Sequence, residues 1–327
     1  MKKNFSFLLV ILFIHVVTVD AKSYRSNGIA LIDSIFDEQI INIKTFTGVI
    51  SATLTTPQRI SKKVPLILII PGAGDIDRNG NNIQKNMVTN TYKLLAIYLA
   101  EKGIASVRYD KRLIGLSTSS TKLSELGIED YVDDATDIVN FFKDNNKFSK
   151  IVLLSHGQGV LIGSIVVSDV SIDKFIAIDG TSEREDKVLT DQMSSKPSYI
   201  AEGFKAVLDS LRKGKTKPDV DLSLYYIAKP DRQHFLMSWC RYDPLIEFKN
   251  IKCPLLIIQG ANDLNSNTKD AIKFKETKRK SEISLFNDMD YNLKIIKGKE
   301  NTTNVIDYNN VQLDRNFADI VVNFVKQ

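Results

Sequence analysis

The strongest candidate for chemistry in this sequence is a five-residue turn, Ser155-His156-Gly157-Gln158-Gly159. It follows an apolar run that predicts a buried strand, and it precedes a run with helical spacing. A sharp turn between a strand and a helix presents a nucleophilic serine at its apex, provided that the residues two before and two after the apex are small. Ser155 and Gly159 meet this steric demand, but the apex is Gly157. The turn therefore predicts a nucleophile site that has no nucleophile.

Strands that alternate with helices must position such a turn. An edge hairpin is expected first, over residues 40–44 and 49–55. Apolar runs then predict further strands, and apolar residues at helical spacing predict helices between them. This alternation is typical of an α/β fold, a mostly parallel sheet with helices on both faces. The expected strands cover residues 66–70, 104–109, 150–154, 175–178, 255–259 and 283–286, and the expected helices cover residues 92–101, 131–143, 160–167, 268–278 and 316–325.

The alternation lapses over residues 181–241, which contain helical pieces and an aromatic-rich segment. We interpret this stretch as a helical cap inserted between two strands. The core then comprises residues 22–180 and 242–327. Since the site of an open α/β sheet lies at the carboxyl ends of its strands, the loops after those strands are the places to look for chemistry.

Several of these loops carry motifs that resemble a known family. Residues 71–80 read PGAGDIDRNG, and residues 108–117 read RYDKRLIGLS, with Leu113 where the related pattern has glycine. Tyr242-Asp243-Pro244 and the run up to Asp263 complete the set. Together with the elbow at Gly157, these motifs are similar to those of the α/β-hydrolases, in the secreted esterase and serine-aminopeptidase-like branch. The resemblance runs from about Phe36 to the C-terminus, and it implies the α/β-hydrolase fold.

Carried over by position, the resemblance puts Gly157 at the nucleophile, Asp263 at the acid and Tyr291 at the histidine of the catalytic triad. It also implies an oxyanion hole formed by the backbone amides of Gln158 and of Ala73 or Gly74, with His156 beside it as a further ligand contact.

The triad order of this fold, nucleophile then acid then histidine, gives a second argument that needs no alignment. The only histidines are His15, His156 and His234, so no histidine follows Asp263. Glycine has no hydroxyl, and tyrosine, with a pKa near 10, is a poor base at neutral pH. Glycine does relieve the backbone strain of an elbow apex. An engineered nucleophile trap would have kept a late histidine.

Other chemistry has little support. A relocated nucleophile at Ser155 is disfavoured, because a residue before the apex belongs to the buried strand. His234 in the cap is either a ligand contact or an ordinary packing residue. Asp263 could hydrogen-bond Tyr291 as a remnant of the triad. No cluster at ligand spacing predicts a metal, and no motif predicts a cofactor.

The N-terminus predicts export. Lys2 and Lys3 precede an apolar run over residues 5–19, which is shorter than a bilayer span and ends at a cleavage pattern after Ala21. We read residues 1–21 as a signal peptide, with a retained membrane anchor as the alternative, and expect a secreted or periplasmic protein without a later membrane segment.

Two further features bound the possible partners. Cleavage after Ala21 would leave 42 of 44 basic and 38 of 39 acidic residues, a net charge of +4 that is not concentrated in one block of sequence, so nucleic acid is not expected as a partner. Cys240 and Cys253 either pair or remain free thiols.

The favoured hypothesis is a pseudoenzyme that binds a small acyl, ester or peptide-like ligand in the former active site. The alternatives are a residual esterase or peptidase, with water activated by Asp263 or His156, and a structural or partner-binding protein with a vestigial pocket. The sequence leaves the oligomeric state open.

Overall fold

The computed structural model describes residues 35–58, 62–296, 308 and 311–327. The predicted signal peptide, residues 1–21, lies outside the described residues. Among the described residues, no helix combines the length and the hydropathy that a bilayer crossing requires.

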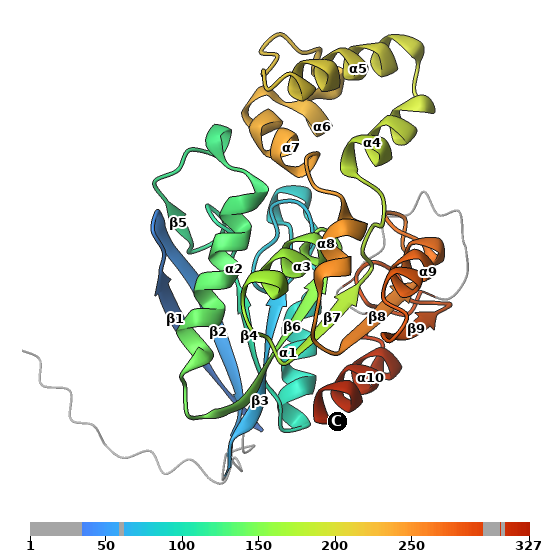
Figure 1. The fold of residues 1–327 in the computed structure, drawn as a ribbon. Helices are drawn as coiled ribbons and strands as arrows, with labels where there is room; N and C mark the ends of the chain where they lie inside the picture. Colours follow the sequence, from blue (N-terminus) through green and yellow to red (C-terminus); the bar gives the residue numbers. More distant parts are fainter. Residues whose placement is uncertain (1–34, 59–61, 297–307, 309–310) are drawn as a thin grey trace, which may run out of the picture. The chain divides into compact units, whose positions relative to one another are not determined.

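One nine-stranded sheet organises the chain from residue 35 onward, in the order β1-β2-β4-β3-β6-β7-β8-β9, with β5 paired to β2. The first hairpin is antiparallel, and β2 also pairs antiparallel with β4, whereas β3, β4 and β6 to β9 are mutually parallel. Figure 1 shows the resulting twisted sheet. The strands are β1 (Phe36–Lys44), β2 (Gly48–Pro57), β3 (Val64–Ile70), β4 (Ala105–Tyr109), β5 (Thr118–Ser119), β6 (Phe148–His156), β7 (Lys174–Ile178), β8 (Leu255–Gly260) and β9 (Glu282–Phe286).

Helices cover both faces of this sheet, as the alternation predicted. Two apolar clusters, one for each face, account for the layers. One cluster joins the sheet to α2 (Ile128–Lys143), α3 (Gly159–Asp169), α8 (Pro244–Asn250) and α9 (Thr268–Thr277). The other joins it to α1 (Thr91–Glu101) and α10 (Arg315–Lys326). The central strands are buried on both faces, which explains their continuous apolar sequences.

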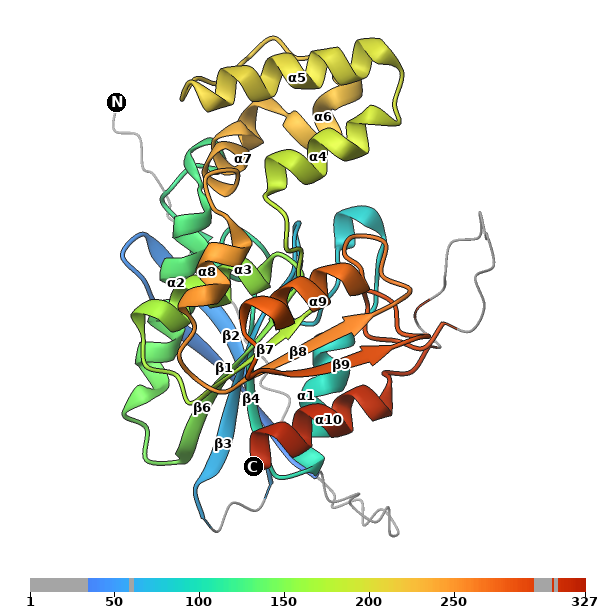
Figure 2. The same ribbon diagram turned by 45° about the vertical axis from the view of Figure 1, so that its right-hand side comes forward.

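Between β7 and α8 the chain forms a group of helices with an apolar cluster of its own, drawn above the sheet in Figures 1 and 2. All of them lie inside the predicted cap, residues 181–241. Cys240 in this region and Cys253 in the core are both free thiols. The helices are α4 (Glu185–Ser194), α5 (Ser198–Arg212), α6 (Tyr225–Ala228) and α7 (Gln233–Trp239), with the 3-10 turns η3 (Leu222–Leu224) and η4 (Pro230–Arg232).

Candidate functional site

The elbow is built as its sequence requires. β6 ends at His156, α3 begins at Gly159, and Gly157 adopts a left-handed φ of 54° at the turn between them. A Cβ on residue 159 would lie 2.7 Å from the carbonyl oxygen of Ile70 and 2.8 Å from that of Pro71, so only glycine fits there. Ser155 is fully buried, and its Oγ lies 2.1 Å from where a Cβ on Gly163 would stand. The Ser155 hydroxyl therefore points into the packing against α3.

Tyr291 lies directly against this turn. It follows β9, in the loop between β9 and α10, and its hydroxyl oxygen is 2.4 Å from the position that a Cβ on residue 157 would take. The same oxygen is 2.0 Å from the position of a Cβ on Gly72. The phenol thus fills the space left free by two residues without side chains. A serine at position 157 could not be accommodated unless the Tyr291 side chain moved.

Burial and neighbouring charges keep the phenol of Tyr291 protonated. Burial raises the pKa of Tyr291 well above its ordinary value, and nearby Tyr92, Asp263 and Asp179 raise it further. A favourable interaction of the phenol with the backbone amide of Ala73 offsets part of the rise. Ala73 was predicted to contribute to the oxyanion hole, so the phenol oxygen now occupies a position expected for a ligand oxygen.

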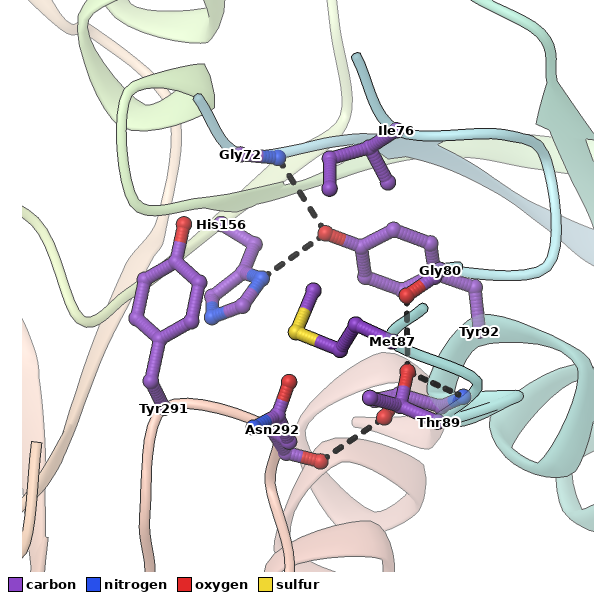
Figure 3. A pocket seen from close by; sticks show the side chains of 10 residues that line it. Gly72, Ile76, Gly80, Met87, Thr89, Tyr92, His156, Tyr291 and Asn292 are labelled. Atoms are coloured by element: carbon purple, nitrogen blue, oxygen red, sulfur yellow. Dashed lines mark hydrogen bonds between the residues drawn. The ribbon is translucent and has the colours of Figure 1, made fainter. Parts of the chain in front are cut away.

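His156 is buried between two aromatic rings, as Figure 3 shows. Its Nδ1 is 2.8 Å from the hydroxyl of Tyr92, which in turn accepts a 3.1 Å hydrogen bond from the amide of Gly72. Nδ1 is the only acceptor that the described residues offer to the proton of the Tyr92 hydroxyl, so the hydroxyl donates to Nδ1 and the proton of a neutral imidazole stands on Nε2. The ring of Tyr291 lies on the other side, with centroids 4.3 Å apart.

The environment of His156 keeps the imidazole neutral. Burial lowers the pKa of His156 to about 4, against a smaller opposing effect of the Tyr291 backbone. Nε2 lies 3.8 Å from Oδ2 of Asp179, beyond hydrogen-bond distance, and neither atom has a hydrogen-bond partner among the described residues. Burial and the neighbouring Asp263 raise the pKa of Asp179 well above its ordinary value. Sequence reasoning missed both Tyr92 and Asp179.

Asp263 follows β8, but its carboxylate turns toward its own loop. Oδ1 accepts from the amide and side chain of Asn265, and Oδ2 accepts from the amide and hydroxyl of Ser266. The possible hydrogen bond between Asp263 and Tyr291 is not formed, and local donors engage both carboxylate oxygens instead. Burial raises the pKa of Asp263 in spite of these donors.

The loop over residues 71–80, here called the oxyanion loop, is held from several sides. Lys111 is buried, and its Nζ donates to the carbonyl oxygens of Gly72 and Gly74 at 3.0 and 3.1 Å. Arg78 forms a 2.6 Å ion pair with Asp110 at the end of β4. These contacts give a structural reason for the two sequence motifs over residues 71–80 and 108–117.

The helical insertion is tied to the core beside this loop. Arg232 forms an ion pair with Asp75 in which both carboxylate oxygens are 3.0 Å from Nη2. His234 contacts the carbonyl oxygen of Leu126 through Nδ1 at 3.1 Å. Through this contact His234 packs the insertion against the core, as an ordinary packing residue would.

The room left beside Tyr291 is small. A cavity of about 20 Å³ lies among Gly72, Tyr92, His156, Tyr291 and other residues, enough for one water molecule. Gln158, at the first turn of α3, is buried, and neither polar atom of its carboxamide has a partner among the described residues. The described part of the chain contains no group of His, Cys, Asp and Glu side chains arranged to hold a metal.

Comparison with known proteins supports the fold. No family profile matches the chain. The chain is 23% identical to the esterase EstD of Thermotoga maritima over 292 aligned residues. This alignment covers 89% of this chain and 68% of that protein. Among solved structures, the esterase Pf2001 of Pyrococcus furiosus superposes with a TM-score of 0.56 at 14% identity, covering 89% of this chain and 92% of the other. Est1E of Butyrivibrio proteoclasticus, solved with ferulic acid, superposes with a TM-score of 0.55 at 14% identity. This superposition covers 88% of this chain and 96% of the other.

The chain therefore has the α/β-hydrolase fold, and the predicted resemblance is confirmed at that level. The relatives that define this conclusion are esterases. The roles assigned to Gly157, Asp263, Tyr291, Ala73, Gly74, Gln158 and His156 stay predictions, because a shared fold does not establish chemistry.

Proposed function

We propose that this protein is a pseudoenzyme of the secreted esterase and serine-aminopeptidase-like branch, which has lost hydrolase activity and in which Tyr291 guards the former active site. In this proposal a small acyl, ester or peptide-like ligand binds only when the phenol leaves the amide of Ala73. One observation carries the proposal, namely the Tyr291 hydroxyl between Gly72 and Gly157, in the space that a nucleophile would need.

The chemistry of the site supports loss of activity. Gly157 offers no attacking atom, and a phenol whose pKa is raised above its ordinary value is protonated at neutral pH and accepts no further proton from a nucleophile. Absence of any one triad member typically removes several orders of magnitude in rate. Both defects together leave only the amides of the oxyanion hole, which stabilise charge but do not attack a carbonyl.

A residual hydrolase is the second candidate, favoured by the esterase relatives. It needs a base to activate water. His156 already accepts a hydrogen bond at Nδ1 and has a lowered pKa, and the Asp263 carboxylate accepts four hydrogen bonds from its own loop. Neither group supports this role well.

In a third candidate, a partner-binding protein, the pocket is vestigial and substitutions at Tyr291 leave the partner's affinity unchanged.

Export to a secreted or periplasmic location is part of the proposal and rests on residues 1–21. Mass spectrometry of the protein recovered from its native host tests it. A mature chain that begins at Lys22 supports cleavage, whereas recovery of the intact N-terminus supports the membrane-anchor alternative.

Activity measurements with nitrophenyl esters and a fluorophosphonate probe test the loss of catalysis. We expect no turnover and no labelling for the native chain or for Gly157→Ser alone, because the new serine lacks a base and meets the Tyr291 hydroxyl. The double variant Gly157→Ser/Tyr291→His should be labelled and should turn over ester. Native turnover that disappears in Asp263→Asn would instead establish the residual hydrolase. An inactive but folded double variant would contradict the placement of Tyr291.

Thermal shift with butyrate as the probe tests the guarding role of Tyr291. We expect Tyr291→Ala to be stabilised by butyrate more than the native chain, because truncation frees the Ala73 amide. Tyr199→Ala, at a tyrosine that is 65% exposed in α5, is the matched control and should behave as the native chain does. Equal responses from all three proteins would argue against a ligand site at Tyr291.

A further inference from the structure

The opposite edge of the sheet, away from the elbow, collects positive charge. The parallel strands β3, β4 and β6 to β9 all begin there, and so does β1, because it is antiparallel to β2, which is antiparallel to β4. We call the chain segments at this edge the amino edge. It comprises residues 35–37, 57–58, 62–63, 101–104, 143–150, 169–174, 249–254, 278–282 and 326–327.

The amino edge holds a disproportionate share of the protein's basic residues. Thirteen of the 44 lysines and arginines lie in these segments, against six of the 39 acidic residues. The C-terminal carboxylate adds one further negative charge. Outside the amino edge the balance reverses, with 31 basic and 33 acidic residues. The net positive charge of the protein is therefore a property of this one edge.

These cations are available to a partner. Ten of the thirteen are exposed, and none forms an ion pair with another described residue. The other three, Lys150, Lys174 and Lys278, are half-buried, and Lys150 and Lys174 donate to the carbonyl oxygens of Val325 and Phe324 at the end of α10. The exposed ten are Lys62, Lys63, Lys102, Lys143, Lys147, Lys249, Lys252, Arg279, Lys280 and Lys326.

We propose that the amino edge binds the surface of an anionic phospholipid bilayer. Twelve of its thirteen cations are lysines, compact charges on flexible stems that suit a fluid array of headgroups, whereas arginine predominates where planar groups are recognised in fixed geometry. Two large apolar side chains stand exposed at or next to this edge, namely Ile35 within it at 53% and Phe141, in the last turn of α2 just before its 143–150 segment, at 50%. Apolar side chains among lysines are typical of surfaces that rest in a bilayer interface.

The path of the chain agrees with this orientation. The described chain enters at Ile35, on the amino edge, and the apolar run over residues 5–19 precedes it. As a signal peptide or as an anchor, that run would bring the chain to a membrane. The proposal does not depend on the state of the elbow.

Vesicle co-sedimentation tests the proposal on the chain from Lys22 to Gln327, which retains the whole sheet and all three apolar clusters. The probes are vesicles of phosphatidylcholine alone and vesicles that also contain phosphatidylglycerol. The edge variant is Lys147→Gln/Lys252→Gln/Lys280→Gln. The matched control, Lys205→Gln/Lys213→Gln/Lys215→Gln, removes the same charge from exposed lysines in and beside α5.

We expect binding only to the anionic vesicles, and loss of that binding at high salt. Each lysine near such a surface contributes about five-fold in affinity, so the edge variant should bind about a hundred-fold more weakly while the control loses little. Equal weakening of the two variants, or no binding to anionic vesicles, would overturn the proposal. So would much tighter binding to heparin or to duplex DNA than to vesicles, which would assign the edge to a polyanion.

Discussion

The oxyanion loop and the elbow lie side by side at the carboxyl edge of the sheet, but their polar groups are satisfied to very different degrees. In the loop, Arg78 bonds to Ser51, Thr53 and Asp110, and Lys111 bonds to two backbone carbonyls. At the elbow, five of the nine unpartnered buried side-chain atoms in the described part of the chain belong to Ser155, His156, Gln158 and the adjacent Asp179.

This difference separates the contacts that stabilise the fold from the groups that stand where the family resemblance places chemistry. The bonds of the loop join β2, β4 and the loop itself, so they stabilise the protein whether or not a substrate binds. The only side-chain hydrogen bond that the described residues make at the elbow is the one between His156 and Tyr92, and Tyr291, which packs against the turn, comes from a distant loop. The contacts that hold the oxyanion loop therefore do not depend on which residue stands at position 157.

Removal of the Arg78 side chain should show the largest effect. Arg78→Ala leaves Asp110 buried without its cation, and breaking a buried pair in this way typically costs about 3–5 kcal/mol in the free energy of unfolding. Denaturation with guanidinium chloride measures the loss. Lys229→Ala, which breaks an exposed ion pair with Asp231, is the control and should change stability by less than about 1 kcal/mol. Similar small losses in both variants would mean that the loop is not held by this pair.

The buried Lys111 should make stability depend on pH in the alkaline range. Burial lowers the pKa of Lys111 to about 8, while an unfolded lysine titrates near 10.4. Between these values the unfolded chain binds a proton that the folded chain does not, so the stability contributed by this group rises with pH. The gain is about 3 kcal/mol over the window.

Comparison of the native chain with Lys111→Met isolates this effect, because all other titrating groups are shared. The difference in unfolding free energy between the two proteins, measured by urea denaturation from pH 7.5 to pH 10, should shift in favour of the native chain as the pH rises. Parallel curves would show that Lys111 keeps its ordinary pKa and that the loop does not enclose it.

The sequence was sufficient to predict most of the fold. Strands buried on both faces, such as β3 and β8, require continuous apolar runs, and these are visible without any structure. The turn at Gly157 was equally predictable, because glycine at position 159 and serine at position 155 answer steric demands that act within five residues.

The partners of the site residues were not predictable in the same way. Tyr92 and Asp179 reach His156 from 64 and 23 positions away, and no local pattern marks them. The hydrogen bond between Asp263 and Tyr291, which the sequence left as a possibility, is not formed, and Asn265 and Ser266 bind the same carboxylate from two and three residues away. The basic amino edge was missed because its lysines are dispersed in the sequence and only the parallel sheet gathers them.

Two glycine substitutions at the elbow should have the smallest effects, and they sharpen the comparison of the elbow with the oxyanion loop. In Gly159→Ala the new Cβ meets backbone oxygens of Ile70 and Pro71, which cannot move aside, so overpacking should cost about 1–3 kcal/mol. In Gly157→Ala the Cβ meets the far end of Tyr291, which can shift, and the left-handed backbone adds about 1 kcal/mol. The cost at position 157 should thus be the smaller of the two.

A double-mutant cycle with Tyr291→Phe distinguishes a clash with Tyr291, expected at position 157, from a clash with backbone oxygens, expected at position 159. Removal of the phenol oxygen takes away the atom that a Cβ on residue 157 would meet, so Gly157→Ala should be less destabilising in the Tyr291→Phe background, by about 0.5 kcal/mol or more. Gly159→Ala does not meet Tyr291 and should cost the same in both backgrounds, as denaturation of the three single and two double variants would show. Additive costs at position 157 would mean that Tyr291 does not occupy the space of the missing nucleophile, and the proposal that it guards the site would fail with them.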